Sequence, residues 1–191
     1  MGKLVLFMHV SLDGLVAGPN GEMDWITVNE EIFDYVGKRI EGTDTALYGR
    51  VTYQMMEGYW PTAAEQPGAT KHDKEHSAWY KRVTKVVLSK TMQGQNLPNT
   101  RIISDNLQSE INDVKKKAGN DILIFGSPSA AHSLMAENLI DEYWLFVNQV
   151  LLGEGIPMFK NISSRTALEF ATSHVFSSGV VCLHYKTKDN Q

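Results

Sequence analysis

The sequence predicts an α/β fold in which a mainly parallel sheet ends in an antiparallel hairpin at one edge. Short apolar runs rich in β-branched residues, typical of strands buried on both faces, alternate with segments of helical periodicity. Residues 168–187 then alternate around Ser177-Ser178-Gly179, which is the pattern of a β-hairpin. Strands that alternate with helices favour parallel pairing, and the hairpin supplies the antiparallel edge.

The amino-terminal part begins with a strand at Lys3–Val10, a continuous apolar run. A helix is expected over 28–40, with its start at Asn29 and its acidic followers. The apolar face of this helix consists of Val28, Ile32, Phe33, Val36 and Ile40. A strand at 45–49 and a short helix from about Val51 come next.

The segment 57–82 is the least regular part of the chain, because it contains Pro61 and Pro67. A helix is expected only in its second half. The helix after the strand at 100–104 is expected to open at Asp105. The remaining strands are expected at 85–89, 100–104, 121–126 and 140–152, the helices at 105–120 and 127–138, and loops at 11–21 and 153–159.

A chain of 191 residues is most simply one domain, spanning 1–191. The net charge of −4 and the pI of about 5.8 argue against a general nucleic-acid binder. The amino terminus lacks signal-peptide features, and no apolar run approaches the roughly 18 residues that span a bilayer. The single cysteine, Cys182, is expected to be a buried apolar residue, since it cannot form a disulfide within the chain. We therefore expect a cytoplasmic protein that binds neither nucleic acid nor membrane.

Ligands of open α/β sheets bind beyond the carboxyl ends of the strands, and three of these ends carry suitable groups. Gly126 would let a ligand approach the backbone closely. Ser127 is expected to cap the helix that follows, and Pro128 suits its first position. A helix that starts in this way offers free amides and a partial positive charge, which attract anions. An ordinary capped helix has the same pattern, so this segment alone is weak support for a ligand site.

Two cations follow two different strands of the predicted sheet and would lie on the same rim. Arg50 comes after the strand at 45–49, and Lys90 comes after the strand at 85–89. Arginine binds phosphate with two hydrogen bonds and lysine binds it as a point charge. Two such cations beside helix amides match NADPH, which carries a phosphate that NADH lacks. The competing interpretation of Arg50 is a surface arginine that pairs with an acidic neighbour.

The chain resembles the dihydrofolate reductase superfamily, and more closely its branch related to the pyrimidine reductase of riboflavin biosynthesis. The resemblance spans nearly the whole chain. It rests on "SLDGLVAGPNGEMDW" (11–25), "GRVTYQMM" (49–56), "VVLSKT" (86–91), "IFGSPSAAHSLMAENLIDEYWLFVNQVLLGEGIPMF" (124–159) and the closing hairpin. The most specific stretch is "LIDEYWLFVNQVLLGEGIPMF" (139–159). The resemblance implies a three-layer α/β/α fold, NADPH bound across the strand ends, and a homodimer.

The resemblance also implies roles for individual residues. Those expected at the cofactor phosphates are Gly49, Arg50 and Thr52, with Ser89 and Lys90 near the 2′-phosphate. Those expected at the pyrophosphate are Gly126, Ser127, Pro128, Ser129 and Ala130. Those expected to face the nicotinamide are Val10, Leu15, Ala17 and Gly18. The sequence departs from the family by having Gly126-Ser127 in place of two glycines. It also lacks a carboxylate at the folate position of the first helix, where Glu30, Glu31 and Asp34 do not match.

A reductase needs a proton source near the atom that accepts the hydride. Asp13 and Glu154 lie on loops that could line the pocket, and Trp25 could stack on a flat substrate. For Asp13 the competing interpretation is a turn residue, since Asp-Gly turns are frequent.

The segment "HDKEH" fits a zinc pattern, with His72 and His76 on one helical face. The pattern lacks a third ligand in a strongly polar segment, so we expect a solvated helix face and no metal.

The leading interpretation is an NADPH-dependent reductase of a small flat heterocycle. The substrate would be a pyrimidine like 5-amino-6-(5-phosphoribosylamino)uracil, or a pterin. The first alternative is a reductase-fold nucleotide-binding protein without turnover. The second is a zinc hydrolase at His72 and His76.

Overall fold

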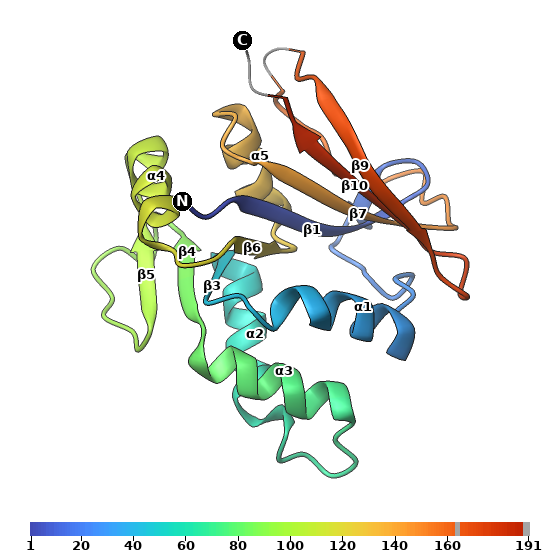
Figure 1. Ribbon diagram of the computed structural model, residues 1–191, viewed down its shortest axis with the longest axis horizontal. Coiled ribbons are helices and arrows are strands. Elements are labelled where there is room, and N and C mark those ends of the chain that lie inside the picture. The colour runs from blue at the N-terminus through green and yellow to red at the C-terminus, as the bar shows by residue number, and fades with distance from the viewer. Residues whose placement is uncertain (163–164, 189–191) are drawn as a thin grey trace.

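The computed structural model describes residues 1–162 and 165–188. Its centre is a sheet with the strand order β5-β4-β3-β6-β1-β7-β10-β9 (Figure 1). These strands are β1 (Leu4–Ser11), β3 (Thr45–Gly49), β4 (Thr84–Leu88), β5 (Thr100–Ile103), β6 (Ile122–Phe125), β7 (Glu142–Asn148), β9 (Leu168–Val175) and β10 (Val181–Thr187). Strands β5 to β7 pair in parallel, and β10 and β9 pair antiparallel. The predicted parallel sheet with an antiparallel edge is therefore confirmed.

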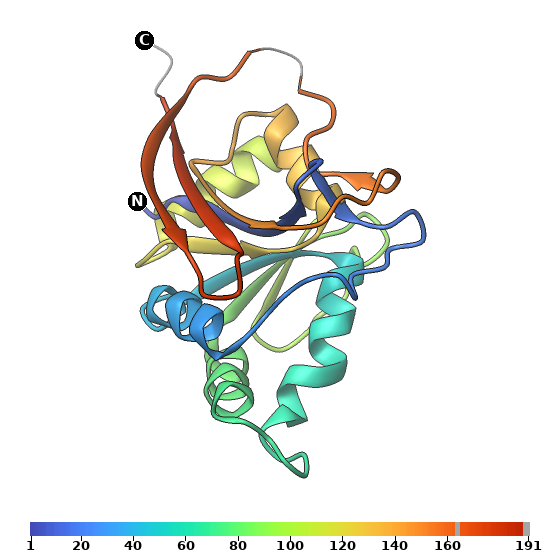
Figure 2. The same cartoon turned by 90° about the vertical axis from the view of Figure 1, so that its right-hand side faces the viewer.

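Helices cover both faces of the sheet and make three layers (Figure 2). The helices are α1 (Glu30–Ile40), α2 (Arg50–Ala63), α3 (Lys71–Arg82), α4 (Leu107–Lys117) and α5 (Pro128–Ala136). The first three share a core with one face of the sheet, and α4 and α5 share a core with the other. Strand β1 shows why: Leu4 and Leu6 point into the α4–α5 core, while Val5 and Phe7 point into the α1–α3 core. Among the described residues, none of the helices is both long and apolar enough to cross a membrane.

The segment 57–82 is more regular than expected. Helix α2 continues to Ala63 and includes Pro61 in its last turn. Pro61 cannot donate to the carbonyl of Glu57, four residues before it, and the helix ends soon afterwards, at Ala63. Helix α3 starts at a capping box, in which the Thr70 and Asp73 side chains each accept from the other's backbone amide.

Two predicted loops contain a short strand each. Strand β2 (Leu15–Ala17) pairs antiparallel with β8 (Ile156–Pro157), so the loops at 11–21 and 153–159 hold each other in place. The expected long strand at 140–152 is shorter and ends at Asn148. Asn29 caps α1 as predicted, whereas α4 is preceded by Asn106 rather than by Asp105.

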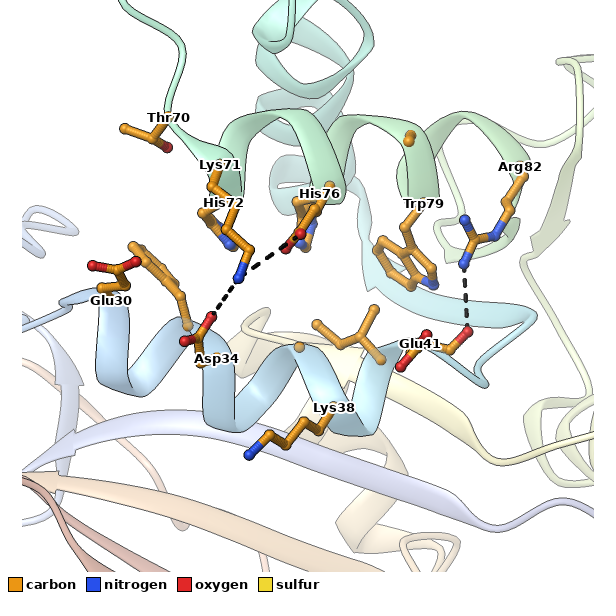
Figure 3. Close-up of a pocket in the computed structure, with 15 residues that line it drawn as sticks. Glu30, Asp34, Lys38, Glu41, Thr70, Lys71, His72, His76, Trp79 and Arg82 are labelled. Atoms are coloured by element: carbon orange, nitrogen blue, oxygen red, sulfur yellow. Dashed lines mark hydrogen bonds and ion pairs between the residues drawn. The ribbon is translucent and has the colours of Figure 1, made fainter.

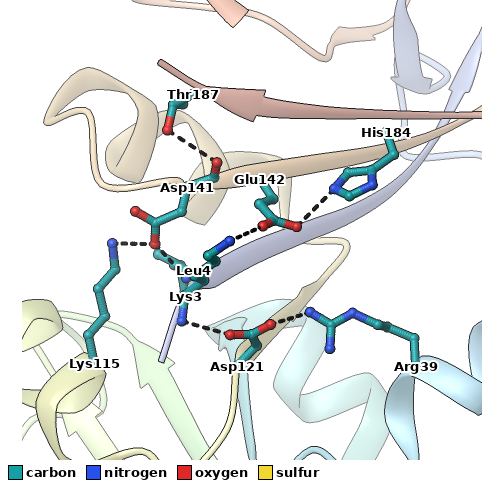
Figure 4. A network of polar contacts seen from close by, with 9 residues as sticks. All are labelled: Lys3, Leu4, Arg39, Lys115, Asp121, Asp141, Glu142, His184 and Thr187. Atoms are coloured by element: carbon teal, nitrogen blue, oxygen red, sulfur yellow. Dashed lines mark hydrogen bonds and ion pairs between the residues drawn. The ribbon is translucent and has the colours of Figure 1, made fainter. Parts of the chain in front are cut away.

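Charged side chains gather at the amino ends of the strands (Figure 4). Glu142 is 5% exposed, and its two oxygens accept from Lys3 Nζ at 2.6 Å and approach His184 Nε2 at 2.8 Å. Asp141 accepts from Lys115 Nζ at 2.6 Å and from the amide of Leu4 at 2.6 Å. These contacts fix the start of β1 between its neighbours, at the end of the sheet opposite to the strand ends considered below.

Candidate functional site

The carboxyl ends of β3 and β6 meet at one buried hydrogen bond. The amide of Gly49, which ends β3, donates to Ser127 Oγ at 2.7 Å. A Cβ atom at position 49 would lie 2.9 Å from that Oγ and 3.4 Å from Ala130 Cβ, so only glycine fits without displacement. At position 126 a Cβ would meet only the Thr52 side chain, at 3.8 Å. The structure therefore brings together residues predicted from separate segments of the sequence.

Ser127 does not cap α5, in contrast to the prediction. Its φ of 60° is in the left-handed region, and its side chain makes no hydrogen bond to the helix. The hydroxyl instead turns inward and holds Gly49. Helix α2, which begins after Gly49, also has no side-chain cap. The first amides of both helices therefore have no side-chain acceptor, which leaves them available to an anion.

Arg50 and Lys90 lie at the same edge of the sheet, which we call the rim. The rim consists of the carboxyl ends of β3, β4 and β6 and the starts of α2 and α5. Gly49 pairs with Leu88 in the parallel register of β3 and β4, so the residues that follow these two strands are neighbours. Both cations are exposed, and neither makes an ion pair within the part of the chain that the structure describes. Among the described residues, Arg50 donates only to the side-chain oxygen of Gln54, at 3.1 Å. The pairing of Arg50 with an acidic neighbour is therefore not observed.

The residues expected near the nicotinamide surround the β2–β8 pair. Val10 is buried near the end of β1, and Ala17 is buried in β2. Leu15 is half-buried and pairs with Pro157. Ser89 forms a turn, in which its Oγ accepts from the Met92 amide at 3.2 Å. These residues frame the rim, and their roles stay predictions.

Asp13 fixes a loop in this structure. Its carboxylate accepts from Ser11 Oγ at 2.6 Å, from the Gly153 amide at 2.8 Å and from the Leu152 amide at 3.2 Å. These bonds, led by the one from Ser11, lower the pKa of Asp13, which favours the ionised form over a proton donor. Glu154 is exposed on the adjoining loop, and Trp25 Nε1 donates to the Glu22 carbonyl at 3.1 Å.

His9 is a candidate that the sequence analysis did not single out. It is half-buried near the end of β1, and its ring stacks on Phe146 at 4.9 Å. Burial lowers its pKa to about 4, so the imidazole is neutral near pH 7. Its only sequence signal is a polar residue at the carboxyl end of an apolar strand.

Asn148 connects His9 to the loop that precedes α1. The Asn148 amide nitrogen lies 3.3 Å from His9 Nδ1 and donates to the Phe146 carbonyl at 3.0 Å. The Asn148 oxygen accepts from the Thr27 amide at 2.9 Å. Donation from Asn148 to Nδ1 places the ring proton on Nε2, which has no hydrogen-bond partner among the described residues. His9 therefore presents an available donor near the rim.

A groove of about 780 Å³ runs between α1 and α3 (Figure 3). Phe33 of α1 and His72 of α3 stack across it, with ring centroids 3.7 Å apart. His76 packs on Trp60 at 4.0 Å and on Trp79 at 4.9 Å, and burial lowers its pKa to about 3.

The predicted solvated face is therefore wrong, because both imidazoles turn toward aromatic side chains. Within 1–162 and 165–188, no group of three His, Cys, Asp or Glu residues is placed to hold a metal ion.

The groove approaches the rim through Phe125. The centroid of the Phe125 ring lies 5.6 Å from that of Trp79 and 6.3 Å from that of His76. Phe125 is the last residue of β6, directly before Gly126. The Phe125 ring therefore packs near two aromatic side chains of the groove, and Phe125 directly precedes the glycine of the rim.

The chain belongs to the family of the RibD C-terminal domain, whose model matches residues 2–182. The uncharacterized protein YyaP of Bacillus subtilis is 34% identical over 188 residues, covering 96% of this chain and 94% of the relative. A protein assigned to riboflavin biosynthesis from Shewanella sp. PV-4 superposes with a TM-score of 0.73 at 22% identity, over 98% of this chain and 99% of that chain. Dihydrofolate reductase from Enterococcus faecalis, solved with NADP(H), superposes with a TM-score of 0.64 at 16% identity, over 98% of each chain. The solved structures show that the fold is dihydrofolate reductase-like.

Proposed function

We propose that this protein is an NADPH-dependent reductase of a small flat heterocycle. The observation that carries the proposal is the rim where α2 and α5 begin. Two helix starts without side-chain caps are joined there by the Gly49–Ser127 hydrogen bond, beside two cations that have no acidic partner within 1–162 and 165–188. Membership of the RibD C-terminal family supports the same conclusion.

The residues at the rim fit a dinucleotide with an additional phosphate. The backbone at Gly126 is open to close approach, since a Cβ there would meet only one side chain. The backbone amides of Ser129 and Ala130, at the start of α5, would hold the pyrophosphate, and Arg50 with Lys90 would hold the 2′-phosphate. When bound, NADPH supplies a hydride. The protein contributes orientation, a dry pocket and the groups that bind the substrate.

The substrate class that fits best is a pyrimidine like 5-amino-6-(5-phosphoribosylamino)uracil, with a pterin as the other candidate. A pterin site would need a free carboxylate on α1, and two of the three acids there, Glu31 and Asp34, are engaged. Glu31 accepts from the backbone and hydroxyl of Ser177, and Asp34 pairs with Lys71 at 3.4 Å. Phe125 and His9, both half-buried at the rim, offer an aromatic surface and a neutral donor.

A reductase-fold protein that binds the nucleotide without turnover is the second candidate. Asp13, the predicted proton source, is held as a carboxylate by three hydrogen bonds. This favours a binding role unless His9 or a water supplies the proton. Turnover measured on a panel of pyrimidines and pterins separates the two candidates. A cytoplasmic location and a homodimer complete the proposal.

The test is a titration with NADPH and NADH, followed by energy transfer from the tryptophans to the nicotinamide. We expect NADPH to bind more tightly, and Arg50→Ala to lose about tenfold or more of that preference, the worth of a charged hydrogen bond. Arg165→Ala, a change at another exposed arginine, is the control. Absence of binding by both nucleotides would refute the proposal. Equal loss of both in Arg50→Ala would refute the assignment of Arg50 to the 2′-phosphate.

A further inference from the structure

Strand β9 is an open edge of the sheet. It is eight residues long, and every one of its residues except the half-buried His174 is exposed. Phe170 is 56% exposed and Val175 is 68% exposed. Unpaired amides and carbonyls of such a strand can pair with another chain, and proteins normally protect them. At the opposite edge β5 has four residues, and its Arg101 is engaged by Glu110 and Asp113.

The sequence of β9 is complementary to itself when reversed. In an antiparallel pair of two copies centred between Ala171 and Thr172, residue numbers that face each other add to a constant. Leu168 then faces Val175, and Glu169 faces His174. An apolar pair and an acid–imidazole pair thus form twice, once on each side of the twofold axis. Phe170 faces Ser173, which leaves space for the ring.

The faces of the sheet agree with this register. Phe170 pairs with Tyr185, Ser173 with Leu183 and Val175 with Val181, and all point to the face of α4 and α5. The register shift near His184 separates the two halves of the strand but keeps each predicted pair on one face. Edge pairing would therefore place the apolar side chains of the two copies in one continuous row. Figure 1 shows β9 at the outer side of the sheet. Within its own chain, His174 stacks on Tyr35 of α1 at 4.8 Å, and its Nε2 lies 3.9 Å from Glu31 Oε1.

We propose that two copies of this chain pair through β9, in the register that sets Glu169 against His174 of the other copy. This inference rests on the homodimer of the proposed function and names its surface. It predicts one continuous sheet across the dimer. The cofactor rim lies at the ends of β3 and β6, several strands away, so both rims stay accessible.

The test is charge reversal across the axis. Glu169→Lys and His174→Glu each remove two complementary pairs and set like or unmatched groups opposite each other. Two pairs of cross-strand strength correspond to an increase of about tenfold in the dimer dissociation constant. The double variant restores Lys–Glu pairs, so its constant should return to within about threefold of the original. Glu137→Lys, at an exposed position on the end of α5, is the matched control and should change nothing.

Sedimentation over a concentration series measures these constants, and circular dichroism checks that each variant is folded. A monomeric wild-type chain would overturn the proposal, as would a dimer whose constant is unchanged by Glu169→Lys. A double variant no better than the single variants would also overturn the register. NADPH titration of the same samples is read independently. Loss of nucleotide binding with the expected dimer behaviour refutes the reductase and leaves the interface standing.

Discussion

The Gly49–Ser127 contact can be tested with a single methyl group. Gly49→Ala would place a Cβ atom 2.9 Å from Ser127 Oγ and 3.3 Å from Ser127 Cβ, both in a buried site. Overpacking of this kind costs about 1–3 kcal/mol, and loss of the buried amide–hydroxyl bond costs about 1 kcal/mol more. We therefore expect the free energy of unfolding to fall by about 2–4 kcal/mol in urea, with little change in the m value.

Two further variants make the test specific. Gly58→Ala lies in the same helix, α2, where a Cβ would meet nothing within 4 Å. It should stabilise the protein by about 1 kcal/mol, because alanine is the better helix former. Ser127→Gly removes both crowded atoms, so Gly49→Ala should cost about 1 kcal/mol or less in that background. A Gly49→Ala variant as stable as the wild type, or one that Ser127→Gly does not rescue, would refute the reasoning.

Two pH-dependent predictions follow from buried groups. Burial alone would raise the pKa of Glu142, but hydrogen bonds, the strongest from Lys3, lower it below 4.5. The ionised carboxylate therefore stabilises the folded state above that pH, and this stabilisation is lost as the pH falls. Glu142→Gln should therefore unfold more easily at pH 7, with a smaller loss of stability between pH 5 and pH 3, measured by urea unfolding. Burial lowers the pKa of His76 in the folded state to about 3, whereas in the unfolded state it stays near its usual 6.5. Lowering the pH from 7 to 5 protonates His76 only in the unfolded state, so the free energy of unfolding should fall by about 2 kcal/mol. His76→Phe should lose this dependence, and an equal slope in both proteins would contradict the assignment.

The sequence was most informative where a local pattern decides the structure. Apolar runs that alternate with helical segments predicted β1, β3, β4, β5 and β6 and their parallel pairing. A strand buried on both faces, such as β1, admits few polar residues. The cap at Asn29, the proline at the start of α5 and the hairpin turn at Gly179 were also predictable, because each depends on its neighbours along the chain.

The rest depends on contacts between distant segments. Nothing near Ser127 indicates that its hydroxyl holds Gly49, 78 positions away. Likewise, a polar "HDKEH" gave no sign that His72 and His76 would meet Phe33 and Trp60. Tertiary packing overrode the local polarity there. His9 was missed for the same reason, since its partner Asn148 lies on another strand.

Ser127 stands where the family has its second glycine, and its position in the structure bears on whether it crowds the cofactor. A side chain in place of the family's second glycine suggests crowding of the cofactor, which would make Ser127→Gly a tighter binder. In the structure Ser127 is 4% exposed, and its hydroxyl accepts the buried amide of Gly49. This bond holds the starts of α2 and α5 in a fixed relation, so that amides of both helices would face the proposed nucleotide. Ser127→Gly should therefore weaken NADPH binding by loosening that relation, and a gain in affinity would restore the crowding interpretation.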